Sequence, residues 1–150
     1  MNTLKLELVD YILMQIQIKI ENAKAELLLL SASMNEETKS SAGDKYETSR
    51  EMIQQSIQMA ENQINSAVSQ IQIIKSISWN SNHVKPENGA LIKTNTCYFL
   101  IGGFIGPFIY KGKEIYAIAS NSPIFSTIQN KKVGDLFKFK NSDVQILEIC

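Results

Sequence analysis

Residues 6–34, LELVDYILMQIQIKIENAKAELLLLSASM, decide the fold of the first half of the chain. Their apolar side chains recur at alternating steps of three and four residues, at Leu6, Val9, Leu13, Ile16, Ile20, Ala23, Leu27, Leu30 and Met34. This spacing is typical of a helix that packs along one narrow stripe against another helix. The sequence therefore predicts a long helix that needs a helical partner.

The partner follows in the same chain. A second series alternates in the same way and has one polar member, Arg50; it runs Tyr46, Arg50, Ile53, Ile57, Ala60, Ile64, Ala67, Ile71 and Ile74. Between the two series the residues are polar and end in Gly43, and Asp44 with Glu47 has the spacing of a helix N-cap and its capping carboxylate. A connection this short makes the helices antiparallel. We predict an antiparallel coiled-coil hairpin over residues 1–78, with its tip at about residues 35–44.

The second half has the pattern of a small sheet domain. Residues 79–89 are polar and contain Pro86 and the turn pair Asn88-Gly89, which predicts a linker. Short β-type runs follow at residues 90–93, 97–101, 114–120, 136–140 and 144–149. Ser122-Pro123 is a helix-start signal and predicts one short helix between the third and fourth runs. The fold class is thus α+β, with residues 90–150 forming an antiparallel or mixed sheet covered by one helix.

Composition excludes several classes of protein. With 150 residues the chain has room for one ordinary domain, or for a small domain with an extended element, and not for a large multidomain enzyme. Its 15 basic and 15 acidic side chains cancel, which argues against wholesale nucleic-acid binding. The longest uncharged stretch, residues 94–110, contains three glycines and Pro107, so we expect a sheet segment and no membrane partner. Cys97 and Cys150 form no CxxC pair, which indicates a cytoplasmic setting.

The sequence contains no nucleophile constellation, phosphate loop or zinc-ligand spacing. The single histidine, His83, falls in the predicted linker, where we expect a solvated side chain. Cys97 falls in an apolar strand, where we expect it to pack in the core. We therefore expect no catalysis by this chain alone.

Charged residues gather at the predicted tip. Glu36, Glu37 and Asp44 offer oxygen ligands to a hard cation such as Mg²⁺, which would need further ligands from a partner. Alternatively, Asp44 caps the second helix and the two glutamates are a solvated surface. Beside them lie three cations that could meet a phosphate backbone: Lys39, Lys45 and Arg50. The residues alone leave both readings open.

A helical hairpin with an acidic tip, joined to a small sheet domain, resembles the Gre family of bacterial transcript-cleavage and elongation factors. Three segments are similar to signatures of that family: Ser122-Pro123-Ile124, Lys131-Lys132-Val133-Gly134-Asp135 and Ile146-Leu147-Glu148-Ile149. The resemblance implies an FKBP-like antiparallel sheet domain that docks on RNA polymerase beside its secondary channel, with Ser122, Pro123 and Ile124 as the docking residues. It also implies that the coiled coil enters the channel, near the 3′ end of the nascent RNA. Phe125 stands where the family usually has glycine.

The tip departs from the family. Tyr46 followed by Arg50-Glu51 is similar to the start of the second helix in Gre factors and sets the register of the tip. In that register the family has an acid pair that helps to hold a catalytic Mg²⁺ of the polymerase, whereas this chain has Lys39 and Ala42. The resemblance then implies a monomeric factor with no cofactor of its own, which shares at most the Mg²⁺ of the polymerase and binds without stimulating cleavage.

Two other functions are compatible with the same residues. One is a coiled-coil adaptor or structural dimer that does not bind polymerase, which predicts a stable oligomer. The other is an FKBP-like prolyl isomerase, which needs an aromatic-lined pocket that the sequence does not reveal.

Overall fold

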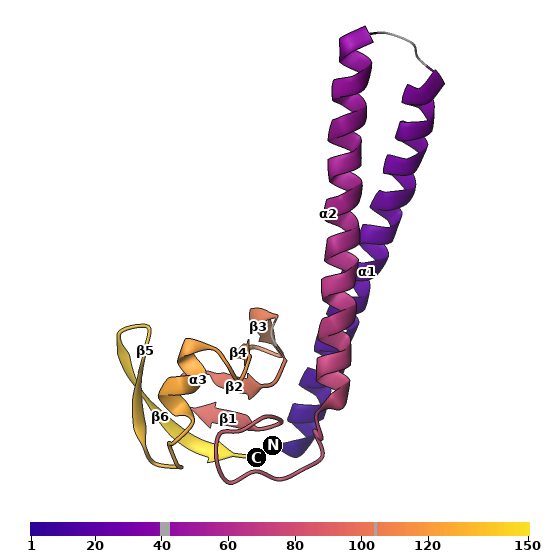
Figure 1. The fold of residues 1–150 in the computed structure, drawn as a ribbon. Helices are drawn as coiled ribbons and strands as arrows, with labels where there is room; N and C mark the ends of the chain where they lie inside the picture. Colours follow the sequence, from indigo (N-terminus) through magenta and orange to yellow (C-terminus); the bar gives the residue numbers. More distant parts are fainter. Residues whose placement is uncertain (40–42, 104) are drawn as a thin grey trace. The chain divides into compact units, whose positions relative to one another are not determined.

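The computed structural model describes the chain apart from residues 40–42 and 104; the side chains of Glu37, Thr38, Lys39, Asp44 and Tyr46 also lie outside the described part. Two long helices, α1 (Asn2–Lys39) and α2 (Gly43–Ser76), precede six strands and one short helix (Figure 1). The predicted α+β class is confirmed. The chain divides into two compact units, Met1–Leu13 with Gln72–Cys150, and Met14–Ile71. This division falls inside the helices and not at residues 79–89, because the first turns of α1 and the last of α2 pack with the sheet.

In the unit Met14–Ile71, α1 and α2 lie side by side and run in opposite directions (Figure 1). The seam predicted from the sequence is the face that they bury: Ile16, Ile20, Ala23, Ala60 and Ala67 are buried. The described seam positions toward the tip, such as Leu30 and Ile53, are half-buried, and the polar member Arg50 is exposed. Over their described residues, neither long helix has a segment apolar enough to cross a bilayer. Both predicted helices are confirmed, and α2 begins within one residue of the predicted start.

The sheet has six strands in the order β3-β4-β2-β1-β6-β5. The strands are β1 (Leu91–Thr94), β2 (Tyr98–Ile101), β3 (Gly106–Tyr110), β4 (Lys113–Ile118), β5 (Leu136–Phe139) and β6 (Ser142–Ile149). All neighbours pair antiparallel except β2 and β4, which are parallel. The sheet is therefore mixed, and the antiparallel sheet implied by the family resemblance is wrong in this pair.

Strand β3 was not among the predicted strands. Its first residues are Gly106 and Pro107, which read as a break. In the structure β3 is an edge strand, where proline is tolerated because its missing N–H is not needed on the open side. A two-residue turn, Lys111-Gly112, with positive φ at both positions, joins β3 to β4.

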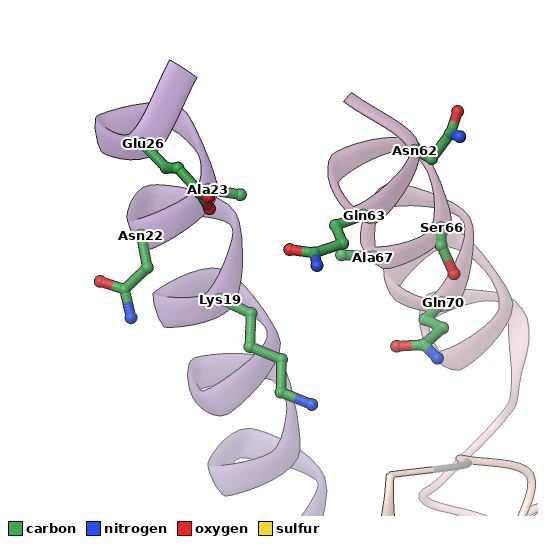
Figure 2. Close-up of a pocket in the computed structure, with 9 residues that line it drawn as sticks. All are labelled: Lys19, Asn22, Ala23, Glu26, Asn62, Gln63, Ser66, Ala67 and Gln70. Atoms are coloured by element: carbon green, nitrogen blue, oxygen red, sulfur yellow. The ribbon is translucent and has the colours of Figure 1, made fainter. Parts of the chain in front are cut away.

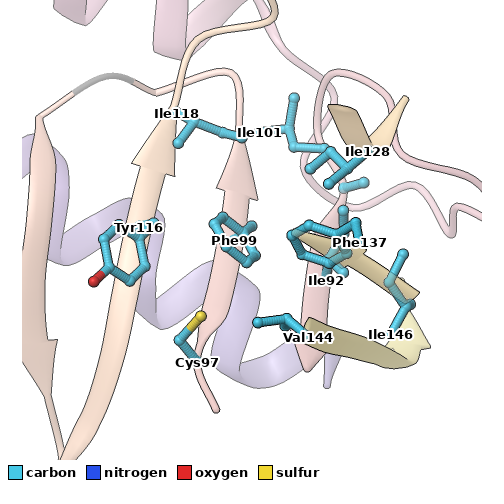
Figure 3. Packing of buried hydrophobic residues seen from close by; sticks show 11 residues of the cluster. Ile92, Cys97, Phe99, Ile101, Tyr116, Ile118, Ile128, Phe137, Val144 and Ile146 are labelled. Carbon is cyan, nitrogen blue, oxygen red and sulfur yellow. The ribbon is translucent and has the colours of Figure 1, made fainter. Parts of the chain in front are cut away.

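Each face of the sheet is covered. One face carries the aromatic and aliphatic core, in which Phe99 lies between Tyr116 and Phe137, and the short helix α3 (Pro123–Ile128) adds Ile128 (Figure 3). On the other face the buried side chains include Leu91, Leu100 and Ile115. The first turns of α1 pack here: the ring of Tyr11 stacks on Phe108 at 5.3 Å and contacts Tyr110 at 5.1 Å, and Lys111 pairs with Glu7 at 2.8 Å.

The segment between α2 and β1 packs against the sheet through the buried Trp79 and Pro86, while most of its other residues are exposed. The Trp79 side chain is buried, and its Nε1 donates to the carbonyl oxygen of Ile74 at 2.7 Å. Gly102 has a φ of +116°, and a Cβ there would lie 2.5 Å from Cδ1 of Ile77. Glycine suits this position because other residues rarely adopt such a φ, and a Cβ would also require the end of the Ile77 side chain to move.

Candidate functional site

The predicted docking residues Ser122, Pro123 and Ile124 form the start of α3. Ser122 is the N-cap: its Oγ accepts from the Phe125 N–H at 3.3 Å and donates to the Ala119 carbonyl oxygen at 2.7 Å. Pro123 occupies the first helical turn, where its missing N–H is not needed. The helix predicted from Ser122-Pro123 is thus confirmed with its cap.

The side chains after Ser122 divide between surface and core. Pro123 is exposed, whereas Ile124 and Phe125 are half-buried and pack against the core cluster. Phe125, which stands where the Gre family usually has glycine, therefore fills core space beside the sheet. A substitution of Ile124 would disturb packing as well as the surface, so Pro123 is the cleaner probe of any docking role.

The second family-like segment is the turn that follows α3. The Lys131 N–H donates to the Ile128 carbonyl oxygen at 2.9 Å, so the segment begins directly at the end of α3. Asp135 closes the turn, because its Oδ2 accepts from the Lys132 N–H at 2.8 Å. Gly134 has a φ of +94°, which favours glycine. Two of the three family-like segments therefore flank one six-residue helix.

The predicted tip residues are only partly described. Glu36 and Lys45 are exposed, and Arg50 is exposed as well. Glu37, Lys39 and Asp44 lie outside the described side chains. Among the described residues no three metal-ligating side chains gather in one place. The Mg²⁺ site of Glu36, Glu37 and Asp44 and the cation group of Lys39, Lys45 and Arg50 stay predictions.

A polar cluster that the sequence did not predict joins β4 to the β5–β6 turn. The Tyr116 hydroxyl hydrogen-bonds to Glu114 and to Lys140, and Nζ of Lys140 lies 3.5 Å from Oε1 of Glu114. Tyr116 donates a hydrogen bond to Glu114, which lowers the pKa of Glu114, and accepts one from Lys140, which raises the pKa of Lys140; burial raises the pKa of Tyr116. The cluster keeps a cation and a carboxylate at the rim of the core. Lys140 lies 24 residues from Tyr116 in the sequence, so no local pattern could have joined it to Glu114 and Tyr116.

The aromatic residues on the core face fill it. Phe99 packs on Tyr116, Phe137 and Phe139 with ring centroids 5.0–5.8 Å apart. These rings pack against one another, and the prolyl-isomerase alternative stays a hypothesis. Cys97 belongs to the same core, and burial raises the pKa of its thiol, so the predicted packing role is confirmed.

His83 is not the solvated residue that its polar surroundings in the sequence predicted. Its side chain is 11% exposed, and Nδ1 lies 3.0 Å from Oε1 of Glu87. The Nε2 atom is buried without a hydrogen-bond partner. The imidazole packs close to Gly89, where a Cβ would lie 3.1 Å from Nε2, and Trp79 and Pro86 of the same segment are buried too.

The helix pair contains an open cleft of about 670 Å³. Its lining is polar apart from Ala23 and Ala67, the small seam residues: Lys19, Asn22, Glu26, Asn62, Gln63, Ser66 and Gln70. Figure 2 shows Lys19 and Gln63 extending from opposite helices toward the space between them. Amide, hydroxyl and charged side chains of this kind hydrogen-bond to water and keep the cleft hydrated. None of the predicted site residues lines this cleft.

Comparisons with protein-family models, curated proteins and solved structures each gave no match to this chain.

Proposed function

We propose that this protein is a Gre-like factor that binds bacterial RNA polymerase through residues 90–150 and inserts the α1–α2 helix pair into the secondary channel. The observation that carries the proposal is the position of the family-like segments. Ser122-Pro123 caps one end of α3 and Gly134-Asp135 forms the turn after its other end, so both serve one short surface helix. Such a factor acts in the cytoplasm, where the polymerase works.

The lengths of α1 and α2 suit a helix pair that enters the secondary channel. α1 has 38 residues and α2 has 34, which corresponds to roughly 50 Å of helix at the usual rise per residue. Their buried seam gives the pair its own packing, so the outer faces remain available to line a channel wall.

The residues at the tip favour a factor that occupies the secondary channel over one that stimulates transcript cleavage. Lys39 and Ala42 stand where the family has its acid pair, and neither can ligate Mg²⁺. Glu36, Glu37 and Asp44 would meet a Mg²⁺ only as part of a site shared with the polymerase. The proposed factor therefore modulates elongation by filling the channel, with indirect access to the RNA 3′ end.

A binding assay tests the proposal. Tagged protein is incubated with core RNA polymerase at low and moderate salt, and retention is measured. Pro123→Glu removes exposed apolar surface while placing a carboxylate in the first turn of α3, where the helix dipole favours it, so the variant should fold and bind more weakly. Asn130→Glu, at an exposed position just after α3, is the matched control and should bind like the parent protein. No retention of polymerase at either salt concentration would refute the proposal.

A second candidate function is a coiled-coil adaptor or structural dimerisation protein without polymerase binding. The exposed apolar residues of the long helices, among them Leu28 and Met59, favour it as an alternative. It predicts a stable oligomer that fails the polymerase assay, so the two functions give opposite results there.

A further inference from the structure

Strand β5 lies at one edge of the sheet, beside β6 (Figure 1). It comes last in the strand order, so its far side meets no strand in the part of the chain that the structure describes. The β5–β6 turn, Lys140-Asn141, has positive φ at both residues, which makes the pair that flanks the turn a hydrogen-bonded one. Because bonded and non-bonded pairs alternate in antiparallel strands, Phe139 and Phe137 direct their N–H and C=O groups to β6. Leu136 and Lys138 direct theirs away from the sheet.

The start of β5 agrees with this phase. The Ile146 N–H of β6 donates to the Asp135 carbonyl oxygen at 3.0 Å, and Asp135 precedes Phe137 by two residues. The outward N–H and C=O groups of Leu136 and Lys138 have no hydrogen-bond partner in the described part of the chain. These donors and acceptors stand in a row at an exposed edge, which is the template that an added strand uses.

The opposite edge, β3, is less suited to an added strand. Its turn to β4, Lys111-Gly112, also has positive φ at both residues, so the outward positions of β3 are Pro107 and Ile109. Proline has no N–H, so Pro107 offers an added strand an acceptor and no donor. Of the two edges, β5 is therefore the one that can form a full set of main-chain hydrogen bonds.

One face of the β5–β6 pair carries exposed leucines. Leu136 is 56% exposed, and Leu147 is 44% exposed. Leu136 pairs with Gln145, and residues two apart on a strand share a face, so the two leucines lie on the same face of the sheet. An added strand that places an apolar side chain opposite Leu136 would cover this leucine from its open side.

Three lysines and two aspartates lie along this edge, and the lysines are the less compensated. Nζ of Lys138 lies 3.2 Å from Oδ1 of Asp143, but both side chains are exposed, so this ion pair contributes little. Lys131 and Lys132, just before β5, form no ion pair in the described part of the chain, and Asp135 accepts from the Lys132 N–H. The charges therefore favour an acidic strand. They disfavour a second copy of β5, which would bring the same lysines together.

We propose that the outer edge of β5 binds an extended acidic peptide segment of a partner protein as an added antiparallel strand. One peptide residue exchanges two hydrogen bonds with Leu136, and the residue two positions before it exchanges two with Lys138. The pattern that fits has an apolar side chain opposite Leu136 and an acidic one on each side, two positions away. The proposal does not depend on polymerase binding, which is assigned to the start of α3, so either can fail while the other stands.

The first test is a titration of the full isotope-labelled chain with a synthetic peptide, followed by NMR without polymerase. The peptide Glu-Val-Leu-Val-Glu, with blocked ends, carries the expected pattern. We expect saturable shifts that include the amides of Leu136 and Lys138, and slower hydrogen exchange of these two N–H groups. Two matched peptides should each bind at least about tenfold more weakly: Glu-Val-Pro-Val-Glu, which lacks the central N–H, and Lys-Val-Leu-Val-Lys, which reverses the charge.

Several results of this titration would overturn the proposal. They are an absence of binding by the acidic peptide at millimolar concentration, equal binding of the basic peptide, and shifts confined to β3 or to the long helices. Self-association of the parent protein through the same amides, seen without peptide, would overturn it as well, because a second copy would then occupy the edge.

The second test separates charge from main-chain bonding in the protein. Lys138→Ala removes the charge and keeps the outward N–H, whereas Lys138→Pro removes both; an edge strand tolerates proline where its N–H points outward. We expect Lys138→Ala to weaken binding of the acidic peptide by about threefold and Lys138→Pro to abolish it. Ile109→Pro, at the outward position of β3, is the matched control and should bind like the parent. Amide spectra check that each variant is folded. Parent-like binding by folded Lys138→Pro, or a loss in folded Ile109→Pro, would contradict the proposal.

Discussion

Lys5 is a buried charge in the sheet unit. Its side chain is fully buried, and Nζ donates to the carbonyl oxygen of Ser81 at 2.8 Å. Burial lowers the pKa of Lys5, and the nearby Cys150 partly opposes this. Because the folded pKa lies below the unfolded one, burial of the ammonium penalises the folded state at lower pH. The penalty is relieved as pH rises from the folded pKa toward the ordinary lysine value of about 10.4.

Two substitutions of Lys5 separate charge from packing. Lys5→Met keeps the aliphatic length and removes the buried charge, so we expect the free energy of unfolding at pH 7 to change by about 1 kcal/mol or less. Lys5→Ala leaves a cavity and should cost about 2–4 kcal/mol. Urea unfolding monitored by fluorescence of Trp79 measures both. Equal losses in the two variants would mean that the hydrogen bond to Ser81, and not packing, carries the contribution of Lys5.

His83 and Glu87 give a pH-dependent prediction. The hydrogen bond from His83 lowers the pKa of Glu87. A lowered carboxyl pKa adds stability that is present above the ordinary glutamate value of about 4.3 and is lost as pH falls through the folded pKa. In His83→Leu, the pKa of Glu87 should return toward its ordinary value, and this part of the acid destabilisation should shrink. Carboxyl titration by NMR in the two proteins measures the shift, and an unchanged Glu87 titration would contradict this account.

At the element scale, α3 depends on its cap. With six residues it is too short to be stable by itself, so the Ser122 hydroxyl and the packing of Ile128 hold it in place. Ser122→Ala should lower the free energy of unfolding by about 1 kcal/mol, and Ser122→Asp should retain most of it, because aspartate caps as well as serine. Urea unfolding checks the order of the three proteins. Equal stability of Ser122→Ala and the parent would show that the cap is dispensable.

Elements with local signals could be predicted from the sequence, and those that depend on distant contacts could not. The two long helices and α3 follow from apolar spacing and the Ser122-Pro123 pair, which act within a few residues. The parallel pairing of β2 with β4 is set by packing between distant segments. Strand β3 has Pro107 as its second residue, which is acceptable only because the strand lies at an edge, and the burial of His83 depends on its neighbours. For the candidate site, the start of α3 was predictable, whereas the Glu114, Tyr116 and Lys140 cluster was not.

At the scale of the whole molecule, the proposed function predicts the effect on transcript cleavage. With Lys39 and Ala42 in place of the acid pair, the protein should leave cleavage of a backtracked transcript by RNA polymerase nearly unchanged, while it slows or blocks other factors that use the channel. The assay compares cleavage rates with and without the protein. Robust cleavage that disappears in the double variant Glu36→Gln, Glu37→Gln, with binding retained, would move the protein into the cleavage-factor class.

The central claim is that the helix tip enters the polymerase, and crosslinking from the tip tests it most directly. A photo-crosslinking residue is placed at Lys45, an exposed position in the first turns of α2, and in a control protein at Lys138, an exposed position on β5. The account predicts that position 45 crosslinks to the polymerase segments that line the secondary channel near the catalytic centre, and that position 138 does not. Crosslinks from position 45 that map only to the outer surface of the polymerase, or an absence of crosslinks at concentrations where the two proteins bind, would contradict it.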